Sequence, residues 1–170
     1  VHASSENELQ CGRLENAFGP FDYRLASNND NKKMVETHHF TREVELLIRG
    51  STAGDPGGDL DYTLRAFPNH PRALRSLMEW GFRKKTDRPH GTQWPVWCYF
   101  DRAIRFRPDD AQVRMLYGFY LQRKGKLRES VEQLEVAQKI AGDNANIHYN
   151  IGLVYLDLGQ FEKSLEHAHL

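Results

Sequence analysis

The chain lacks the chemical features on which most enzymes and metal proteins depend. Its 170 residues include only two cysteines, Cys11 and Cys98, which are too few and too far apart for a structural zinc site. It has no glycine-rich phosphate loop, no nucleophile elbow and no pair of histidines flanking a glutamate at metalloprotease spacing. We therefore predict a protein that is not an enzyme, with no cofactor, no bound metal and no catalytic residues.

Neither sign of charge is in excess, and long apolar runs are missing. Lysine plus arginine and aspartate plus glutamate each total 23, so the formal net charge is zero. A surface for nucleic acid or anionic lipid requires an excess of basic residues. Hydrophobic residues make up 39% of the chain, but they form no continuous run long enough to span a membrane. The composition predicts no nucleic-acid partner and no membrane span.

A period of 34 residues is the strongest pattern that the chain does contain. Gly118 and Gly125 recur 34 residues later as Gly152 and Gly159. This period is typical of helical hairpins that stack into a solenoid. The first glycine of each pair allows the two helices of a hairpin to approach closely, and the second ends the first helix in a left-handed turn.

Two segments with this period resemble tetratricopeptide repeats (TPRs). Residues 111–144 have the glycines and apolar residues of a full repeat, and residues 145–170 (ANIHYNIGLVYLDLGQFEKSLEHAHL) match its first three quarters. The resemblance implies an all-α fold, a right-handed solenoid of helical hairpins. It also implies a protein–protein interaction scaffold, which is the usual role of the family.

Two further hairpins are predicted upstream, each closed by a proline. Pro68 and Pro108 occupy equivalent places but stand 40 residues apart, so residues 70–110 form an expanded repeat with an insertion at 85–93. The first helix of this repeat is predicted at residues 71–84 (PRALRSLMEWGFRK). Residues 41–69 are predicted to form a degenerate hairpin. Its first helix should run from Thr41, as the cap, to Arg49 before Gly50, and its second from Asp59 to Phe67.

Residues 1–40 do not fit the repeat and are predicted to form an extended, largely irregular segment. They are rich in serine, asparagine and charge, a composition that is disordered unless something holds it. Phe18, Phe21 and Tyr23 are the expected anchors. These aromatic side chains pack either on the first hairpin of their own chain or on a neighbouring molecule.

The N-terminal half is also similar to a group of proteobacterial repeat proteins without an established activity. The resemblance rests on GPFDYR at 19–24 and on DLDYTLRAFPNHPRAL at 59–74. It implies a bacterial protein in the periplasm or outside the cell, and residues 1–3 resemble the end of a cleaved signal peptide. Cys11 and Cys98 either form a disulfide, which needs an oxidising compartment, or remain a free thiol and a small buried side chain.

The first helices of successive hairpins are predicted to line a concave groove that binds a protein or peptide segment. The groove should be charged at its N-terminal end and apolar toward its C-terminal end. The predicted binding residues are Arg72, Arg75, Glu79, Gln112, Met115, Phe119, Asn146, Tyr149, Asn150 and Leu153. For Met115, Phe119 and Leu153 a place in the core is an equally good interpretation.

Two alternative functions remain open from the sequence. The first is head-to-tail self-assembly into a homo-oligomer or filament, because the last repeat is incomplete. The residues predicted for self-association are Phe18, Phe21, Tyr23, Leu158 and Leu165. The second is metal handling by histidines of the N-terminal half, which otherwise cap helices and bond to the backbone. Those histidines are His38, His39, His70 and His90.

Overall fold

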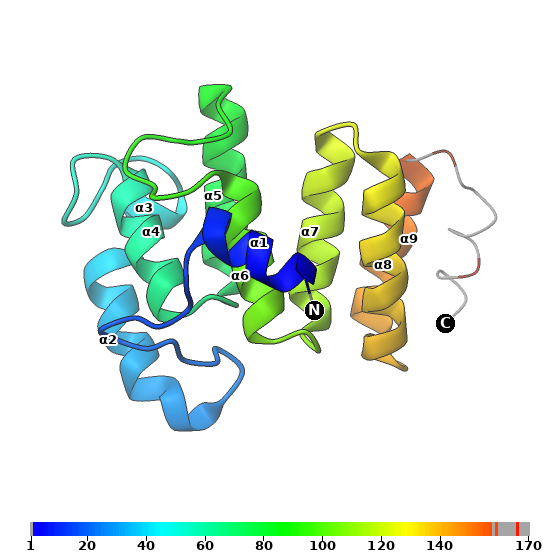
Figure 1. The fold of residues 1–170 in the computed structure, drawn as a ribbon, viewed down its shortest axis with the longest axis horizontal. Helices are drawn as coiled ribbons and strands as arrows, with labels where there is room; N and C mark the ends of the chain where they lie inside the picture. The colour runs from blue at the N-terminus through cyan, green and yellow to red at the C-terminus, as the bar shows by residue number, and fades with distance from the viewer. Residues whose placement is uncertain (1, 158, 160–165, 167–170) are drawn as a thin grey trace. The chain divides into compact units, whose positions relative to one another are not determined.

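The protein is helical throughout the part that the structure describes. The computed structural model describes residues 2–157, 159 and 166, in which there are α-helices and a short 3-10 turn but no β-strand (Figure 1). None of the described helices is both long and apolar enough to cross a membrane. The chain divides into two compact units, residues 1–108 and residues 109–170. The predicted all-α class is confirmed.

The first unit is built around three helices whose ends follow from the sequence. α4 (Pro56–Ala66) and α5 (Pro71–Lys84) each begin with a proline, which fits the first turn because it needs no N–H donor there. α5 covers the same residues as the first helix predicted for the expanded repeat. α6 (Val96–Phe106) follows after a loop that contains the predicted insertion. α4 packs on α5 and α5 packs on α6. The core side chains are Leu60, Leu64, Leu74, Leu77, Met78, Tyr99 and Phe100.

The N-terminal 40 residues contain more regular structure than the sequence predicts. α1 (His2–Cys11) packs on α6, and α2 (Asn29–His39) packs on α4 after a 3-10 turn at Ala26–Asn28. The irregular part is therefore limited mainly to residues 12–25. Val35 is the one buried residue of α2. A helix that buries a single side chain needs no apolar stripe, so the sequence pattern did not reveal it.

The first helix of the degenerate hairpin is shorter than predicted. α3 (Arg42–Glu45) is capped as expected, since the Thr41 hydroxyl accepts a hydrogen bond from the Val44 N–H at 3.4 Å. It ends at Glu45 rather than at Arg49, because Leu47 turns into the left-handed region with φ of 60° and buries its side chain. The carbonyl of Glu45 then accepts a hydrogen bond from Ser76 on α5. α2, which was not predicted, provides the longer helix that packs on α4.

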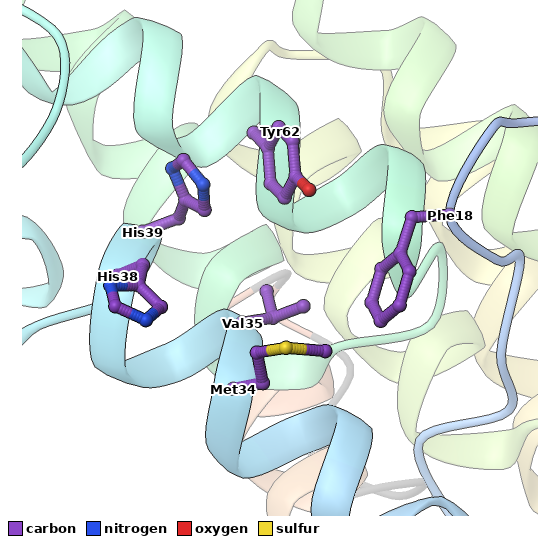
Figure 2. Close-up of a pocket in the computed structure, with 6 residues that line it drawn as sticks. All are labelled: Phe18, Met34, Val35, His38, His39 and Tyr62. Atoms are coloured by element: carbon purple, nitrogen blue, oxygen red, sulfur yellow. The ribbon is translucent and has the colours of Figure 1, made fainter.

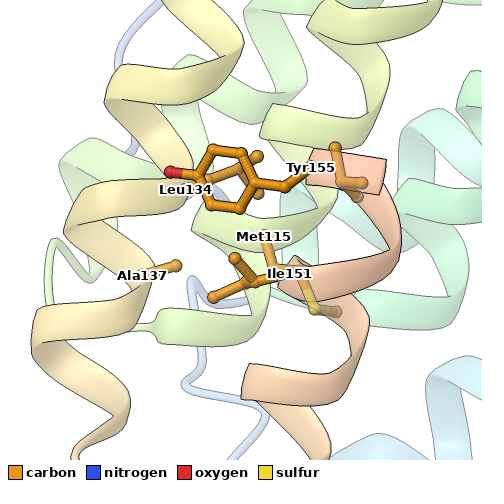
Figure 3. Packing of buried hydrophobic residues seen from close by; sticks show 6 residues of the cluster. Met115, Leu134, Ala137, Ile151 and Tyr155 are labelled. Atoms are coloured by element: carbon orange, nitrogen blue, oxygen red, sulfur yellow. The ribbon is translucent and has the colours of Figure 1, made fainter. Parts of the chain in front are cut away.

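The second unit contains α7 (Ala111–Arg123), α8 (Leu127–Ala141) and α9 (Ala145–Asp157). Each helix packs on the other two. Figure 3 shows their shared core, in which Met115 of α7 meets side chains of the other two helices. Those side chains are Leu134, Ala137, Ile151, Val154 and Tyr155. The second helix predicted for the last repeat falls outside the described residues.

Gly118 has the role that the repeat pattern predicts. A Cβ at this position would lie 2.7 Å from Cδ2 of Leu134, so only glycine allows α7 and α8 to pack this closely. The Ser130 hydroxyl donates a hydrogen bond to the Gly118 carbonyl at 2.6 Å across the same contact. Gly125 has φ of 76° and ends the first helix of the hairpin.

Candidate protein-interaction surfaces

The predicted binding residues of α9 all lie on its exposed side. Tyr149 and Leu153 have exposed fractions of 61% and 43% and are four residues apart, so their side chains lie next to each other along the helix. Asn146 and Asn150 form a second exposed pair at the same spacing. The exposed side of α9 therefore combines an apolar pair with an amide pair that can donate and accept hydrogen bonds.

On α7 the three predicted binding residues have different environments. Phe119 is exposed at 36% and Gln112 is also exposed. Met115 is only 8% exposed and belongs to the core between α7, α8 and α9. Its assignment to the binding surface is therefore wrong, and the core interpretation is correct. The reason is that Met115 packs in one core cluster with Leu134 and Ile151, and the sequence pattern cannot show which apolar side chains of α7 face these helices.

In the first unit, the predicted binding residues lie on α5 and are partly occupied by contacts within the chain. The Arg72 guanidinium bonds to Glu36 at 3.0 Å and to Glu45 at 3.1 Å, and it stacks over the ring of Phe40. Arg75 is exposed and Glu79 is half-buried. Because Arg72 already has two carboxylate partners, a ligand would have to compete with them for its donors.

A hydrogen-bond network connects Arg72 through Glu36 to the buried His70 at the start of α5. His70 caps the helix, since its Nδ1 accepts a hydrogen bond from the Ala73 N–H at 3.1 Å. Its Nε2 must then carry the proton, and it donates to Glu36 at 2.9 Å. Burial lowers the pKa of His70 in spite of the Glu36 carboxylate. The hydrogen bond from His70 in turn lowers the pKa of Glu36.

The aromatic side chains predicted for self-association pack on their own chain. Phe18, Phe21 and Tyr23 lie against a cluster formed by Val35, Ala66 and Phe67. The ring centroids of Phe21 and Phe67 are 5.4 Å apart, and those of Phe18 and Phe21 are 5.0 Å apart. Of the two interpretations given for these aromatic residues, the structure has the one in which they pack on their own chain. Leu158 and Leu165 lie outside the described residues.

A pocket of about 330 Å³ opens beside this aromatic cluster (Figure 2). Val35 forms part of its apolar wall, and the rings of Phe18, His39 and Tyr62 come from a loop and two helices. Met34 and His38 complete the lining. No sequence pattern indicated this pocket, because its lining residues do not follow the repeat period.

The histidines of the N-terminal half have separate structural environments. His39 donates from Nδ1 to Asp59 at 2.9 Å and stacks on Tyr62, with 3.8 Å between the ring centroids. His90 lies 2.7 Å from Asp55, the cap of α4. Within the residues that the structure describes, no three His, Cys, Asp or Glu side chains gather as a metal site requires.

Cys11 and Cys98 are joined by a disulfide, with 2.14 Å between their sulfur atoms. The bond attaches the end of α1 to α6. Beside it, Arg102 is 2% exposed and donates to the carbonyls of Cys11 at 3.0 Å and Arg13 at 2.8 Å. Burial lowers the pKa of this guanidinium to about 10. The sequence did not identify Arg102, because an arginine in a helix pattern normally indicates an exposed position.

A comparison with protein families identifies one part of the chain. A family model described as TPR repeat matches residues 120–159, which extend from the end of α7 to just beyond α9. The fold and this match together define the class of the protein, an all-α protein with a TPR-like helical repeat. TPRs are typical of proteins that bind other proteins. None of the curated proteins compared with the chain matches it.

Proposed function

We propose that the chain is a protein–protein interaction scaffold without enzymatic activity, and that the exposed side of the TPR hairpin binds a protein or peptide segment. The observation that carries the proposal is the repetition of exposed apolar side chains. Phe119 on α7 and Leu153 on α9 are one repeat apart, and both are exposed. Because equivalent positions of stacked repeats face the same side, these residues extend a single surface with Tyr149.

This surface fits a partner segment with apolar side chains and free main-chain hydrogen-bonding groups. Tyr149 and Leu153 supply the apolar contact, and aromatic residues are frequent hot spots in interfaces. Asn146 and Asn150, which are exposed on the same helix, can bond to the main chain of the segment. In the first unit, taken by itself, Arg75 and Glu79 of α5 are proposed as a separate set of polar contact residues.

The experiment compares partner capture by matched surface variants. Tyr149→Ser with Leu153→Ser removes the apolar pair of α9, and Leu127→Ser with Ile140→Ser removes two exposed apolar residues of α8. The wild-type protein is first cross-linked to its partners in the cell fraction where it occurs, and these partners are identified. Each purified variant is then titrated with each partner, and the affinities are compared with that of the wild type. The α9 variant should bind at least about 10-fold more weakly, and the α8 variant should bind as the wild type does. Equal affinity of both variants would rule out the α9 surface.

We also propose that the protein is exported, to the periplasm or beyond the cell of a bacterium. The Cys11–Cys98 disulfide supports this location, because such bonds persist in oxidising compartments and are rare in the cytosol. The similarity of the N-terminal motifs to exported proteobacterial proteins points the same way.

A further inference from the structure

The N-terminal segment is held to the first unit in two different ways. Residues 18–25 are anchored without a covalent bond. The Phe21 N–H donates to the Ala66 carbonyl at 2.8 Å, and the Tyr23 N–H donates to Asn69 at 2.9 Å. Asp22, which is 4% exposed, bonds to Arg107 at 2.9 Å. Together with the aromatic cluster, these contacts hold this part in place independently of the disulfide.

Apart from the disulfide, residues 6–13 are held mainly by hydrogen bonds and bury little apolar surface. Cys11 is the one buried residue in this stretch, and Leu9 is 88% exposed. Asn7 donates to Asp101 at 2.8 Å, and Arg105 donates to the Gly12 carbonyl at 3.1 Å. Arg102 donates to the carbonyls of Cys11 at 3.0 Å and Arg13 at 2.8 Å. Hydrogen bonds of this kind are exchanged for bonds to water when the segment leaves the surface. A helix as short as α1 is also only marginally stable by itself.

We propose that the Cys11–Cys98 disulfide is a latch that keeps α1 and residues 12–13 on α6, and that its reduction releases this segment while residues 18–25 stay bound. In the reaction a dithiol reductant gives two electrons and two protons to the two sulfur atoms. Cys11 and Cys98 become thiols, and the reductant becomes a disulfide. The chain between Arg13 and Phe18 then acts as the hinge.

Release of the segment changes the surface of α6. Gly12 lies so close to Trp94 that a Cβ on it would be 2.5 Å from Cζ2 of the indole. The Arg102 guanidinium is 4.1 Å from the centroid of the same ring, and its Nε has no hydrogen-bond partner among the residues that the structure describes. When residues 11–13 leave, the donors of Arg102 and the face of Trp94 become accessible. The latch therefore controls access to this side of α6.

The test measures amide hydrogen exchange in the oxidised protein, in the protein reduced with dithiothreitol, and in the variant Cys11→Ser with Cys98→Ser. In the last two, amides of residues 6–11 should exchange at least about 10-fold faster. The amides of Phe21 and Tyr23 should keep their protection, because their acceptors are not affected. Trypsin should also cut faster after Arg13, whose side chain is already 78% exposed.

The control is Asn7→Ala in the oxidised protein, which removes the hydrogen bond to Asp101 but keeps the disulfide. It should leave the exchange of residues 8–11 unchanged within about 2-fold. The proposal fails if residues 6–11 stay protected in the double variant, since other contacts then hold them. It also fails if α5 and α6 lose protection together with α1, since the disulfide then supports the whole unit rather than one segment.

Discussion

His70 has two structural roles that depend on one protonation state. Its unprotonated Nδ1 caps α5, and its Nε2–H bonds to Glu36. Protonation would place a hydrogen on Nδ1 and break the cap. Besides Glu36, the charged groups near the ring are Arg72, which disfavours protonation, and Glu45, which favours it. Burial has the largest effect, and the pKa of His70 is lowered in the folded protein.

The lowered pKa of His70 predicts a loss of stability on mild acidification. At a pH above 6.5, the pKa of His70 in the unfolded chain, the residue is neutral in both the folded and the unfolded state. Its contribution to the free energy of unfolding is then complete. Below this pH the unfolded state takes up a proton that the folded state does not, so the free energy of unfolding falls by up to about 1.4 kcal/mol per pH unit. The three tryptophans, Trp80, Trp94 and Trp97, lie in the first unit, so indole fluorescence during urea unfolding reports this change.

His70→Asn is the matched control, because asparagine is a good helix cap that does not titrate. Between pH 7 and pH 5 the variant should lose less stability than the wild type, by about 1 kcal/mol per pH unit. Parallel curves for the two proteins would show that other groups cause the pH dependence.

Gly118 gives a prediction about packing in the second unit. In Gly118→Ala the new methyl group would lie 2.7 Å from Leu134, which is fully buried and cannot move away. Overpacking costs about 1–3 kcal/mol, and the better helix propensity of alanine recovers up to about 1 kcal/mol. We expect a net loss on the order of 1 kcal/mol, seen as faster amide exchange in α7 and α8.

Gly54→Ala is the control for this substitution, because no atom lies within 4 Å of the added methyl group. Its stability should match that of the wild type within about 0.5 kcal/mol. If both variants behave alike, the close contact between α7 and α8 does not depend on Gly118.

At the level of whole elements, the insertion in the expanded repeat is an ordered loop that packs on α4. The Gln93 N–H donates to Asp61 of α4 at 3.2 Å, and the Tyr99 hydroxyl donates to the same carboxylate. Gly57 faces the His90 carbonyl so closely that a Cβ would be 1.9 Å from its oxygen. Gly57, in the first turn of α4, therefore allows the loop to reach the start of this helix.

Gly91→Ala should displace this loop. Gly91 has φ of 88°, and a Cβ on it would lie 2.6 Å from the Gly58 nitrogen, so both the backbone conformation and the available space require glycine. We expect a loss of about 1–3 kcal/mol in the first unit and faster amide exchange in residues 86–93. The emission of Trp94, at the end of the loop, should change as well. Wild-type exchange in the loop would contradict its packing on α4.

For the whole molecule, the disulfide gives the simplest test of export. Protein isolated from its native source without reductant should have an intact mass about 2 Da below that of the reduced protein, from the two hydrogens lost in one bond. Iodoacetamide should modify neither cysteine until the protein is reduced. Two thiols that react in the native, unreduced protein would contradict both the bond and the oxidising location.

The sequence by itself determined the helical class and the TPR hairpin of the second unit. The 34-residue period, Gly118 and Gly125 specified a first helix, a turn and a second helix, because the Gly118 contact leaves no room for a Cβ and the left-handed φ of Gly125 favours glycine. Local signals also placed the start of α5 at Pro71 and the cap of α3 at Thr41. Periodicity and capping are local properties, so they can be read without knowing the fold.

Only the tertiary structure decided which side chains are free to bind. Met115 and Phe119 are one helical turn apart and both apolar, but Met115 fills the core and Phe119 remains exposed. The roles of Arg102 and His70 also depend on partners far away in the sequence, near Cys11 and at Glu36. Burial and hydrogen bonding are set by the elements that pack together, and α1 and α2 reach their places through contacts that no local pattern describes.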